Sequence, residues 1–544
     1  MKQFLFIFCL LLTPLSSYSQ QKLGLLDEIQ MRKFMMAIYS ISHLYVDTVD
    51  SRKLVEDALK GMVKELDPHS TYTSAKDVAE LNEPLTGSFE GIGVQYNINA
   101  DTLVVIQPVV GGPSESVGIV AGDKIVQVND TSIAGVKMSK KEIMRRLRGP
   151  KGSKVKLGVL RSGDKNLRTF VVCRDKIPVL TVDGYYMIDA ESGYLRISNF
   201  GATTHDEFVK AVKYLQSCGM KNLVIDLQGN GGGYLQTAVE IADDLFDNNE
   251  LIVYTDGRSV GRHDFFSKKG NIGVDKIVIL VDGYSASASE ILSGAIQDND
   301  RGVVVGRRTF GKGLVQRALP LPDGSEIRLT IAHYYSPVGR CFQKPYTKGD
   351  KKSYDNDMLD RLNSGELTNL DSIHFPDSLK YLTKKGRNVY GGGGVMPDVY
   401  IPLDTTRFSR FHRELIAHNC FVETTLRYLD LNRKRLSKLY NIESYKNSRT
   451  RLNEGKNVVI DNSGFLRFKD NFDVSDDIIA LLLEKATEAK ITYTDSVLNA
   501  SLPMIKVQLK ALLARDLWDM SEYFQIMNPY SDIYMAGLKA LKDN

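Results

Sequence analysis

Residues 276–316 constrain the fold of this 544-residue chain more than any other stretch. They read KIVILVDGYSASASEILSGAIQDNDRGVVVGRRTFGKGLVQ. Ile277–Val281 is an apolar run with the length and β-branched content of a buried strand. Asp282-Gly283 then breaks the chain, the next segment has the apolar spacing of a helix, and residues 303–305 form a second short apolar run. Strand, tight turn, helix and strand together predict an α/β core.

A serine and a lysine occupy special positions in this stretch. Ser287 lies in the small-residue turn before the helix, where backbone can approach a substrate closely. The first N–H groups of a helix are unpaired and point outward, so Ser287 has oxyanion-binding donors beside it. Lys312 follows the second strand between Gly311 and Gly313. The pattern predicts a serine nucleophile with a lysine base.

These residues resemble the C-terminal processing (tail-specific) proteases. That family carries SASASE, whose middle serine is the nucleophile, and FGKG at the same spacing as here, whose lysine is the base. The resemblance therefore assigns these roles to Ser287 and Lys312, and it makes Gln316 the residue that orients the lysine. Along a strand, side chains four residues apart lie about 13 Å from each other. Only a bent backbone, which Gly313 permits, would bring Gln316 to Lys312.

Two other catalytic patterns are present only in part. Residues 306–312 imitate a P-loop, but Gly313 stands where magnesium binding needs a Ser or Thr hydroxyl. Residues 283–287 lack the last glycine of the G-x-S-x-G hydrolase elbow. A Ser-His-Asp triad stays open by composition, although neither His263 nor His333 lies in a supporting motif.

A glycine-rich loop follows the predicted strand at 222–227. It reads QGNGGG from Gln228 to Gly233, and its glycines do not fit the dinucleotide-binding pattern. The family resembled above has R-x-N-P-G-G here and uses a glycine amide of this loop in its oxyanion hole. Gln228 and Gly231 replace the arginine and the proline. The resemblance assigns the oxyanion hole to the amides of Gly232 and Ala288.

Residues 87–174 alternate short β-rich runs with two helix-like pieces, at 114–117 and 139–147. This unit resembles a PDZ domain, and GIVAGDKI at 118–125 is its most recognisable signature. An upstream G-x-G matches the carboxylate-binding loop of PDZ domains, where consecutive N–H groups converge on an anion and a peptide adds as a strand. The residues of this loop are Gly91, Ile92, Gly93 and Val94.

The first residues predict export. Lys2, an apolar run at 4–12 and small residues at 17 and 19 indicate a signal peptide spanning residues 1–19. The apolar run is too short to cross a bilayer, and we expect a soluble protein that is periplasmic in a Gram-negative cell. Residues 20–86 form the expected N-terminal helical region, with Ser51 capping a second helix. This region ends in LDPHS at 66–70, a turn that the same family carries, and we expect structural roles for His69 and Ser70.

The expected protease core spans residues 175–404. YYSPVGRCFQ at 334–343 and GVMPD at 394–398 resemble family motifs that lie close together in sequence, whereas here residues 346–390 intervene as a charged surface loop or small subdomain. Asp298 matches a position that is sometimes assigned to catalysis in the family. Eleven helical steps put it about 16 Å from Ser287. We therefore expect a structural role for Asp298, with Arg301 as its partner.

Residues 405–544 are predicted to form a C-terminal helical domain without chemistry of its own. A helix capped by Ser475 and another at 503–518 are its clearest elements. Four cysteines remain after the signal peptide, and their wide spacing favours buried free thiols over a disulfide framework or a metal site. They are Cys173, Cys218, Cys341 and Cys420.

The sequence thus predicts a multidomain α/β protein: N-terminal helices, a PDZ domain, an α/β protease core and C-terminal helices. By resemblance it is a serine endopeptidase that recognises apolar protein C-termini and needs no metal or cofactor. A non-catalytic PDZ adaptor is the alternative. A formal net charge of +4 is too small to indicate nucleic-acid binding. An adaptor protein and a second copy of the chain are the further partners that the sequence leaves open.

Overall fold

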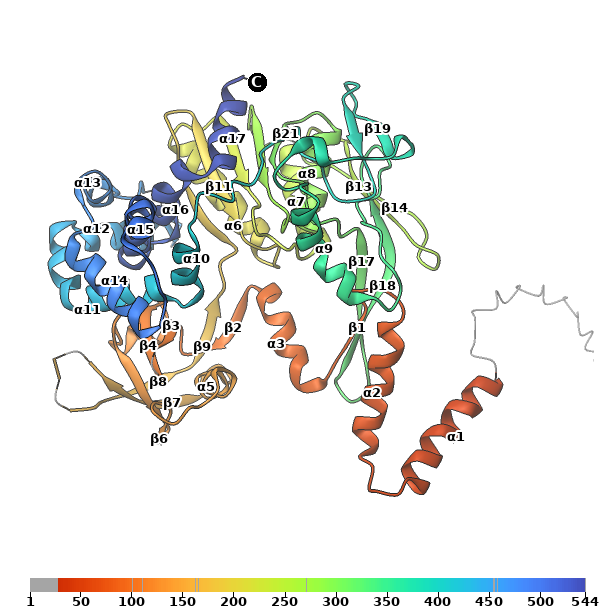
Figure 1. Cartoon of the computed structure of the whole chain (residues 1–544), viewed down its shortest axis with the longest axis horizontal. Helices are drawn as coiled ribbons and strands as arrows, with labels where there is room; N and C mark the ends of the chain where they lie inside the picture. Colours follow the sequence, from red (N-terminus) through yellow and green to blue (C-terminus); the bar gives the residue numbers. More distant parts are fainter. Residues whose placement is uncertain are drawn as a thin grey trace, which may run out of the picture.

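The computed structural model describes residues 28–543 apart from residues 100, 110, 162, 165, 271, 454 and 457. The predicted multidomain α/β architecture is present: N-terminal helices, the unit predicted to be a PDZ domain (the PDZ unit below), the predicted protease core (the core below) and C-terminal helices (Figure 1). The predicted signal peptide lies outside the described residues.

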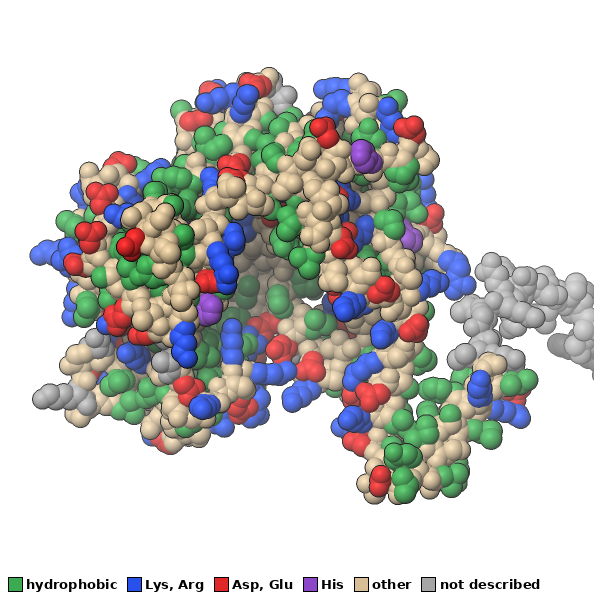
Figure 2. Space-filling model, in the orientation of Figure 1, with side chains coloured by type: hydrophobic (Ala, Val, Ile, Leu, Met, Phe, Trp, Pro, Cys, Tyr) green, Lys and Arg blue, Asp and Glu red, His purple; other side chains and the backbone are tan. Residues whose placement is uncertain are grey.

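Three helices precede the PDZ unit: α1 (Glu28–Leu44), α2 (Ser51–Lys64) and α3 (Ala75–Thr86). No residue of α1 is buried, and Figure 2 shows hydrophobic side chains exposed over this projecting helix. The predicted cap of α2 is wrong by one position. Asp50, rather than Ser51, is the N-cap, because its carboxylate accepts hydrogen bonds from the amides of Arg52 and Lys53.

The LDPHS turn links α2 to the core. The Asp67 carboxylate accepts hydrogen bonds from the His69 and Ser70 amides and from the Ser70 hydroxyl. The chain then enters β1 (Thr71–Thr73), which pairs with β18 (Glu326–Tyr335) of the core. The turn is therefore fixed against the strand that lies next to the predicted lysine segment.

The PDZ unit is a sheet of order β3-β4-β5-β7-β8 with β6 paired to β5 and helices α4 and α5 alongside. The first β-rich run of this unit is divided between β2 and β3, because the chain turns at Gly93, where φ is +71°. Lys141 of α5 pairs with Asp77 of α3, and Gly122 lies against Asp430 of the C-terminal helices. The elements are β2 (Ser88–Gly91), β3 (Val94–Asn99), β4 (Thr102–Pro108), α4 (Pro113–Ser116), β5 (Lys124–Val128), β6 (Thr131–Ser132), α5 (Lys140–Leu147), β7 (Lys154–Leu160), β8 (Arg168–Cys173) and β9 (Asp175–Pro178), of which β9 pairs with β2.

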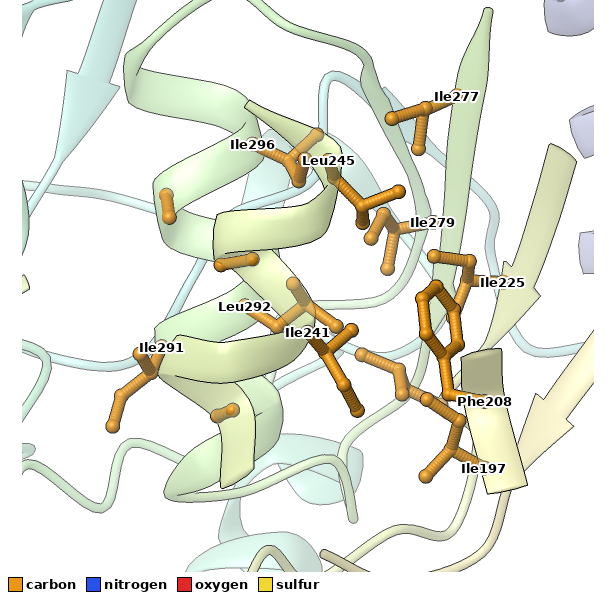
Figure 3. Close-up of a cluster of buried hydrophobic side chains, with 14 of the residues drawn as sticks. Ile197, Phe208, Ile225, Ile241, Leu245, Ile277, Ile279, Ile291, Leu292 and Ile296 are labelled. Carbon is orange, nitrogen blue, oxygen red and sulfur yellow. The ribbon is translucent and has the colours of Figure 1, made fainter. Parts of the chain in front are cut away.

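The core is built on a six-stranded sheet of order β10-β11-β12-β15-β16-β21, parallel from β11 to β21. Successive strand residues point to opposite faces. Ile225 and Ile279 therefore pack with α6, α7 and α8 on one face (Figure 3), while Val224 and Val278 pack with α17 on the other. The elements are β10 (Val182–Met187), β11 (Ser192–Ile197), α6 (Thr204–Ser217), β12 (Asn222–Asp226), α7 (Leu235–Leu245), β15 (Ile277–Val281), α8 (Ala288–Asp298), β16 (Val303–Gly306) and β21 (Val399–Tyr400).

A second sheet, β1-β18-β13-β14 with β17 paired to β18, flanks the first. Its remaining strands are β13 (Leu251–Asp256), β14 (His263–Phe266) and β17 (Leu314–Pro320). The segment from Gly306 to Gly313 thus leads from a strand into another strand. A P-loop leads from a strand into a helix, so this segment lacks the P-loop structure, in line with Gly313 in place of a Ser or Thr.

The insertion at 346–390 is folded and in part buried. Its helix α9 (Lys351–Asn363) packs Tyr354 and Arg361 against the core, where they are 4% and 3% exposed. The other elements are the 3₁₀ turns η1 (Leu370–Ser372) and η2 (Asp377–Leu379) and the strand pair β19 (Lys380–Leu382) and β20 (Asn388–Tyr390). In the view of Figure 1, α9 extends towards β17 and β18.

The C-terminal helices form their own hydrophobic core. The helix predicted to start at Pro503 starts earlier, at Asp495, where Thr494 caps it. This helix, α15, is long and apolar enough to cross a membrane by length and composition, but Leu509 and Leu513 are buried in the protein and core helices of soluble proteins pass the same test. The helices are α10 (Arg410–Ala417), α11 (Cys420–Leu439), α12 (Ile442–Asn453), α13 (Ser463–Asn471), α14 (Asp476–Glu488), α15 (Asp495–Leu517), α16 (Met520–Met527), the 3₁₀ turn η3 (Asn528–Tyr530) and α17 (Asp532–Asp543).

The four cysteines after the first 27 residues are free thiols, as predicted, but they are not all buried. Cys420 is buried, Cys218 and Cys341 are partly buried, and Cys173 is exposed. Cys173 ends β8, where its position on the outward side of the PDZ sheet leaves the thiol in solvent.

Asp298 has a different partner from the predicted one. Its carboxylate forms an ion pair of 2.6 Å with Arg340, and both side chains are fully buried. Arg301 instead donates hydrogen bonds to the backbone carbonyls of Leu245 and Asp275. The ion pair joins the end of α8 to the segment after β18, and it is structural.

We predict that Asp298→Ala destabilises the core strongly. Removing one partner of a buried ion pair leaves the other charge uncompensated, which costs about 3–5 kcal/mol. The exposed pair of Arg410 and Glu414 offers a matched control, since Glu414→Ala should cost less than about 0.5 kcal/mol. Urea unfolding followed by circular dichroism measures both. Equal, small losses in the two variants would contradict the structural role.

Candidate active site

Ser287 occupies a strained turn between β15 and α8. Its φ is +56° and its ψ is −112°, a backbone conformation that non-glycine residues rarely adopt. The side chain is 6% exposed. Ala288 is the first residue of α8, and its N–H makes no hydrogen bond within the described part of the chain. A buried hydroxyl and an amide donor without a partner in the described chain thus meet at one helix start.

The Glu290 carboxylate connects this turn to the lysine segment. Oε2 accepts hydrogen bonds from the Ser287 amide at 2.7 Å and from the Lys312 amide at 2.9 Å. Oε1 accepts from the Thr309 hydroxyl at 2.6 Å and from the Gly311 amide at 2.7 Å. The backbones of Ser287 and Lys312 are therefore held by the same oxygen atom.

Glu290 is fully buried. Burial raises the pKa of its carboxyl group, and the hydrogen bonds from Thr309 and from the amides of Ser287, Lys312 and Gly311 act in the opposite direction. Four donors converge on two oxygens, which is the coordination that a buried carboxylate requires in place of water. The carboxylate thus joins the turn that contains Ser287 to the loop that contains Lys312.

Two glycines allow the lysine loop to pass close to other backbone segments. Gly311 has φ of +89°, and a Cβ there would meet Lys344 Cβ at 3.0 Å. A Cβ on Gly313 would meet the Gln343 amide nitrogen at 2.5 Å. The two glycines of FGKG are therefore required by close packing on both sides of Lys312.

Lys312 Nζ donates a hydrogen bond of 3.2 Å to Gln316 Oε1. Burial lowers the pKa of the Lys312 ammonium and the positive charge of Arg328 lowers it further, against the opposing charges of Glu290 and Asp67. Among the residues that the structure describes, no hydrogen bond joins Lys312 to the Ser287 hydroxyl. Gln316 therefore holds the Lys312 side chain, and the pKa of that side chain is lowered. Its contact with the Ser287 hydroxyl is not formed within the described chain.

Gln316 reaches Lys312 because the strand is irregular. The register of β17 against β18 shifts between Val315 and Gln316, a bulge that re-aims the side chain. Gln316 Nε2 donates to the His69 carbonyl at 2.6 Å, which leaves Oε1 facing the lysine. The bent backbone that the sequence required is present, and its bend lies after Gly313 rather than at it.

The glycine loop at 228–233 packs directly on the nucleophile turn. A Cβ on Gly232 would meet Ser287 Cβ at 2.7 Å and the Ala288 amide nitrogen at 3.0 Å. The Gly232 N–H donates to Asn230 Oδ1 at 2.8 Å. Asn230 is fully buried, and its carbonyl accepts from the Ala286 amide and the Ser289 hydroxyl. The two predicted oxyanion amides thus lie together, and that of Gly232 is held by Asn230.

The departures from the family pattern in this loop are accommodated by Asp226. Gln228 donates to Asp226 Oδ1 through its amide and its side chain. Asp226 Oδ2 accepts from Tyr194 and lies 3.5 Å from Arg196 of the neighbouring strand. Arg196 therefore supplies a guanidinium beside this loop, where Gln228 replaces the family's arginine.

The predicted carboxylate loop lies at the edge of the PDZ sheet. Gly93 adopts φ of +71°, and the N–H groups of Ile92 and Gly93 make no hydrogen bond within the described chain. The loop leads into β3, which is the edge strand of its sheet and has one side unpaired. Free amides beside an open strand edge can accept a peptide terminus.

The histidine alternatives do not form a triad with Ser287. His263 Nε2 contacts the Val260 carbonyl on exposed β14, and His333 has no hydrogen bond or ion pair to Ser287. His69 Nε2 lies 3.0 Å from the Tyr354 hydroxyl, and burial and the charge of Lys312 lower the His69 pKa to about 3. Over the described residues, no group of three His, Cys, Asp or Glu side chains could hold a metal ion.

Sequence reasoning missed four contributors to this site. Glu290 is the last residue of the SASASE motif, but the sequence did not indicate that its carboxylate binds the Lys312 segment. Tyr334 lies beside the Ser287 hydroxyl, and burial raises its pKa to about 12. Asn230 holds the glycine loop. The His69 carbonyl orients Gln316, and the LDPHS turn was its only signal.

Four family models match parts of the chain. Peptidase family S41 matches residues 191–353, and the PDZ domain matches residues 104–161. The N-terminal domain of the activating protease CtpB matches residues 14–77, and a family of unknown function matches residues 453–519. The first match contains Ser287, Lys312, Gln316, Glu290 and the glycine loop, whereas the LDPHS turn, the PDZ loop at 91–94 and the insertion beyond residue 353 lie outside it.

Several characterised proteins are similar over more than half of this chain. The carboxy-terminal-processing protease of Bartonella bacilliformis is 37% identical over 55% of this chain and 69% of its own length. The carboxy-terminal processing protease CtpA of Bacillus subtilis is 33% identical over 63% of this chain and 73% of its own. CtpB of the same organism is 35% identical, over 66% of its length. A solved structure, the photosystem II D1 C-terminal processing protease, is 27% identical, covers 68% of this chain and 92% of its own, and has a TM-score of 0.34.

We predict that Glu290→Gln destabilises the core. An amide presents NH₂ where one carboxylate oxygen accepts two donors, and each buried donor left without an acceptor costs about 1–3 kcal/mol. Glu240→Gln on α7 is the control, because among the described residues the Glu240 carboxylate accepts a hydrogen bond only from the Gln236 side chain. Thermal unfolding followed by circular dichroism compares the two. A midpoint for Glu290→Gln equal to that of the control would contradict the bridging role.

Proposed function

We propose that this chain, which belongs to the carboxy-terminal processing protease family within peptidase family S41, is an exported serine endopeptidase that cleaves proteins after binding their C-terminal tails. One observation carries the proposal. Glu290 Oε2 accepts hydrogen bonds from the amides of both Ser287 and Lys312, so the two segments that the chemistry needs are held by one atom.

The proposed reaction is acyl transfer from a peptide bond to Ser287. The Ser287 hydroxyl oxygen attacks the scissile carbonyl carbon while the neutral Lys312 amine takes the hydroxyl proton. The tetrahedral intermediate collapses, and Lys312 returns that proton to the departing amine. Water then attacks the ester formed on Ser287, again with Lys312 as base, and releases the new C-terminus.

Lys312 acts as a base only when it is neutral, and its ordinary pKa is about 10.4. The lowered pKa that burial and Arg328 produce supports this role. Gln316 accepts one N–H of the lysine and is itself held by the His69 carbonyl, which restricts the direction in which Nζ presents its lone pair.

The proposed oxyanion hole consists of the amides of Ala288 and Gly232. The Ala288 N–H is free in the resting structure, and the Gly232 N–H exchanges Asn230 Oδ1 for the oxyanion when substrate is bound. One such donor typically contributes about 100–1,000-fold in rate. The absence of a hydrogen bond between Ser287 and Lys312 in the described chain fits a site that closes fully on substrate.

Tail recognition is assigned to the PDZ unit. The free amides of Ile92 and Gly93 bind the terminal carboxylate, and the tail adds as a strand along β3. A preference for apolar ends is what the family resemblance implies. Export, to the periplasm in a Gram-negative cell, is proposed from the signal peptide that the sequence predicts at residues 1–19.

We predict that Ser287→Ala abolishes cleavage and keeps tail binding. The test substrate is a small protein with an apolar C-terminus, compared with the same protein carrying a charged C-terminus. Gel analysis reports cleavage, and calorimetry reports binding of the tail peptide. Cleavage by the Ser287→Ala protein would exclude this nucleophile. Binding without cleavage by the unsubstituted protein would favour a non-catalytic adaptor.

We predict that activity rises with pH through an apparent pKa below the ordinary lysine value of about 10.4. The rate rises with pH because protonated Lys312 cannot accept a proton. Since burial lowers the Lys312 pKa, its neutral fraction grows at a lower pH than that of a lysine in water. The dependence of kcat/KM on pH for a fluorogenic peptide measures it. A rate independent of pH between 6 and 10 would rule out a titrating lysine base.

A further inference from the structure

We propose that helix α9 of the insertion at 346–390 is part of the active site, and that Tyr354 is a positioning residue for Lys312. The inference rests on the proposed function and adds residues that lie outside the SASASE and FGKG motifs. One face of α9 carries its contacts to the core. They come from Lys351, Tyr354, Asp357, Met358 and Arg361.

Tyr354 belongs to a ring of hydrogen bonds that encloses the lysine. Its hydroxyl lies 3.0 Å from His69 Nε2, and the Gln343 side chain donates to it at 3.4 Å. Gln343 Oε1 accepts from the Gly313 amide at 2.9 Å, and the His69 carbonyl accepts from Gln316, which accepts from Lys312. This series of hydrogen bonds therefore begins at the Lys312 side chain and ends at the backbone amide of the next residue, Gly313.

Tyr354 and His69 are the two titratable groups of this hydrogen-bond network outside Lys312. Burial raises the pKa of the Tyr354 hydroxyl, so it stays protonated and donates. The lowered His69 pKa, about 3, keeps that imidazole neutral, and in the tautomer with its proton on Nδ1 the Nε2 atom accepts from Tyr354. Removing the Tyr354 hydroxyl would leave Nε2 of His69 without a donor and free the turn whose carbonyl holds Gln316.

Arg361 fixes the other side of the same loop from α9. It is 3% exposed and donates to the carbonyls of Thr309 and Phe310 at 2.8 and 3.0 Å. Arg361 also forms an ion pair with Asp357, and Asp357 forms a second ion pair with buried Lys344. Lys344 Nζ lies 3.9 Å from the ring centre of Phe310 and 4.1 Å from that of Tyr354. The loop before Lys312 is thus packed between α9 and the core.

Charged groups from four elements face Lys312. Arg328 of β18 and Lys351 of α9 are cationic, and Glu290 of α8 and Asp67 of the LDPHS turn are anionic. Lys351 Nζ also donates to the Pro68 carbonyl at 2.8 Å, so α9 holds the LDPHS turn at two points. Loosening α9 would admit water to Lys312 and return its pKa towards the ordinary value.

The test is Tyr354→Phe in the full chain, which keeps the aromatic side chain and removes its hydroxyl group. The readout is the rate at which a fluorophosphonate labels Ser287 as a function of pH, because this small probe needs neither the PDZ unit nor a tail. We expect the midpoint of the rising limb to move up by about one pH unit, which lowers labelling about tenfold below the midpoint. Lys351→Met at the exposed end of α9 should move the same limb in the same direction.

Tyr381→Phe is the matched control, since its hydroxyl makes no hydrogen bond within the described chain and it lies in the same insertion. Its profile should superimpose on that of the unsubstituted protein. A purely structural role of Tyr354 would lower the labelled amount at every pH and leave the midpoint unchanged, which would overturn the inference. If Tyr354→Phe does not fold, an unchanged midpoint in Lys351→Met overturns it. Failure of the unsubstituted protein to label at Ser287 would instead refute the proposed function.

Discussion

The site depends on one buried carboxylate. Glu290 replaces its lost hydration with four hydrogen bonds, two from the nucleophile turn and the lysine backbone and two from the loop between them. A buried charge tolerates little displacement of its donors, because each lost bond leaves desolvation uncompensated. The strained conformation of Ser287 and the close approach of Gly311 therefore persist together, held by the same interaction.

The rest of the molecule surrounds the Glu290 carboxylate and the two segments that it binds. The parallel sheet presents the ends of β12 and β15 side by side, so the glycine loop and the serine turn leave the sheet at neighbouring points. The LDPHS turn and α9 then enclose the lysine from outside the core. The PDZ unit lies between α3 and α11 and contacts both, and Figure 2 shows the surface hollowed between the C-terminal helices and the protease core.

Local sequence pattern predicted most of the core. Ile277–Val281 and the helix after Ser287 have the composition of buried elements, and the structure has them at those residues. Long-range partners were not predictable in the same way. Asp298 pairs with Arg340 rather than Arg301, because the chain after β18 returns to the end of α8. The reach of Gln316 depends on a bulge between it and Val315, which leaves no mark in composition.

The face of the core sheet opposite α8 is closed by α17. Val224, Val278 and Leu280 of the sheet pack with Ile533, Tyr534 and Leu541 of that helix, which follows the catalytic segment by several further helices. During synthesis the sheet therefore stays open to water on one side after Ser287 and Lys312 have already been made. A ribosome-bound or truncated chain would carry Ser287 and Lys312 on an unfinished, aggregation-prone sheet until α17 has been made.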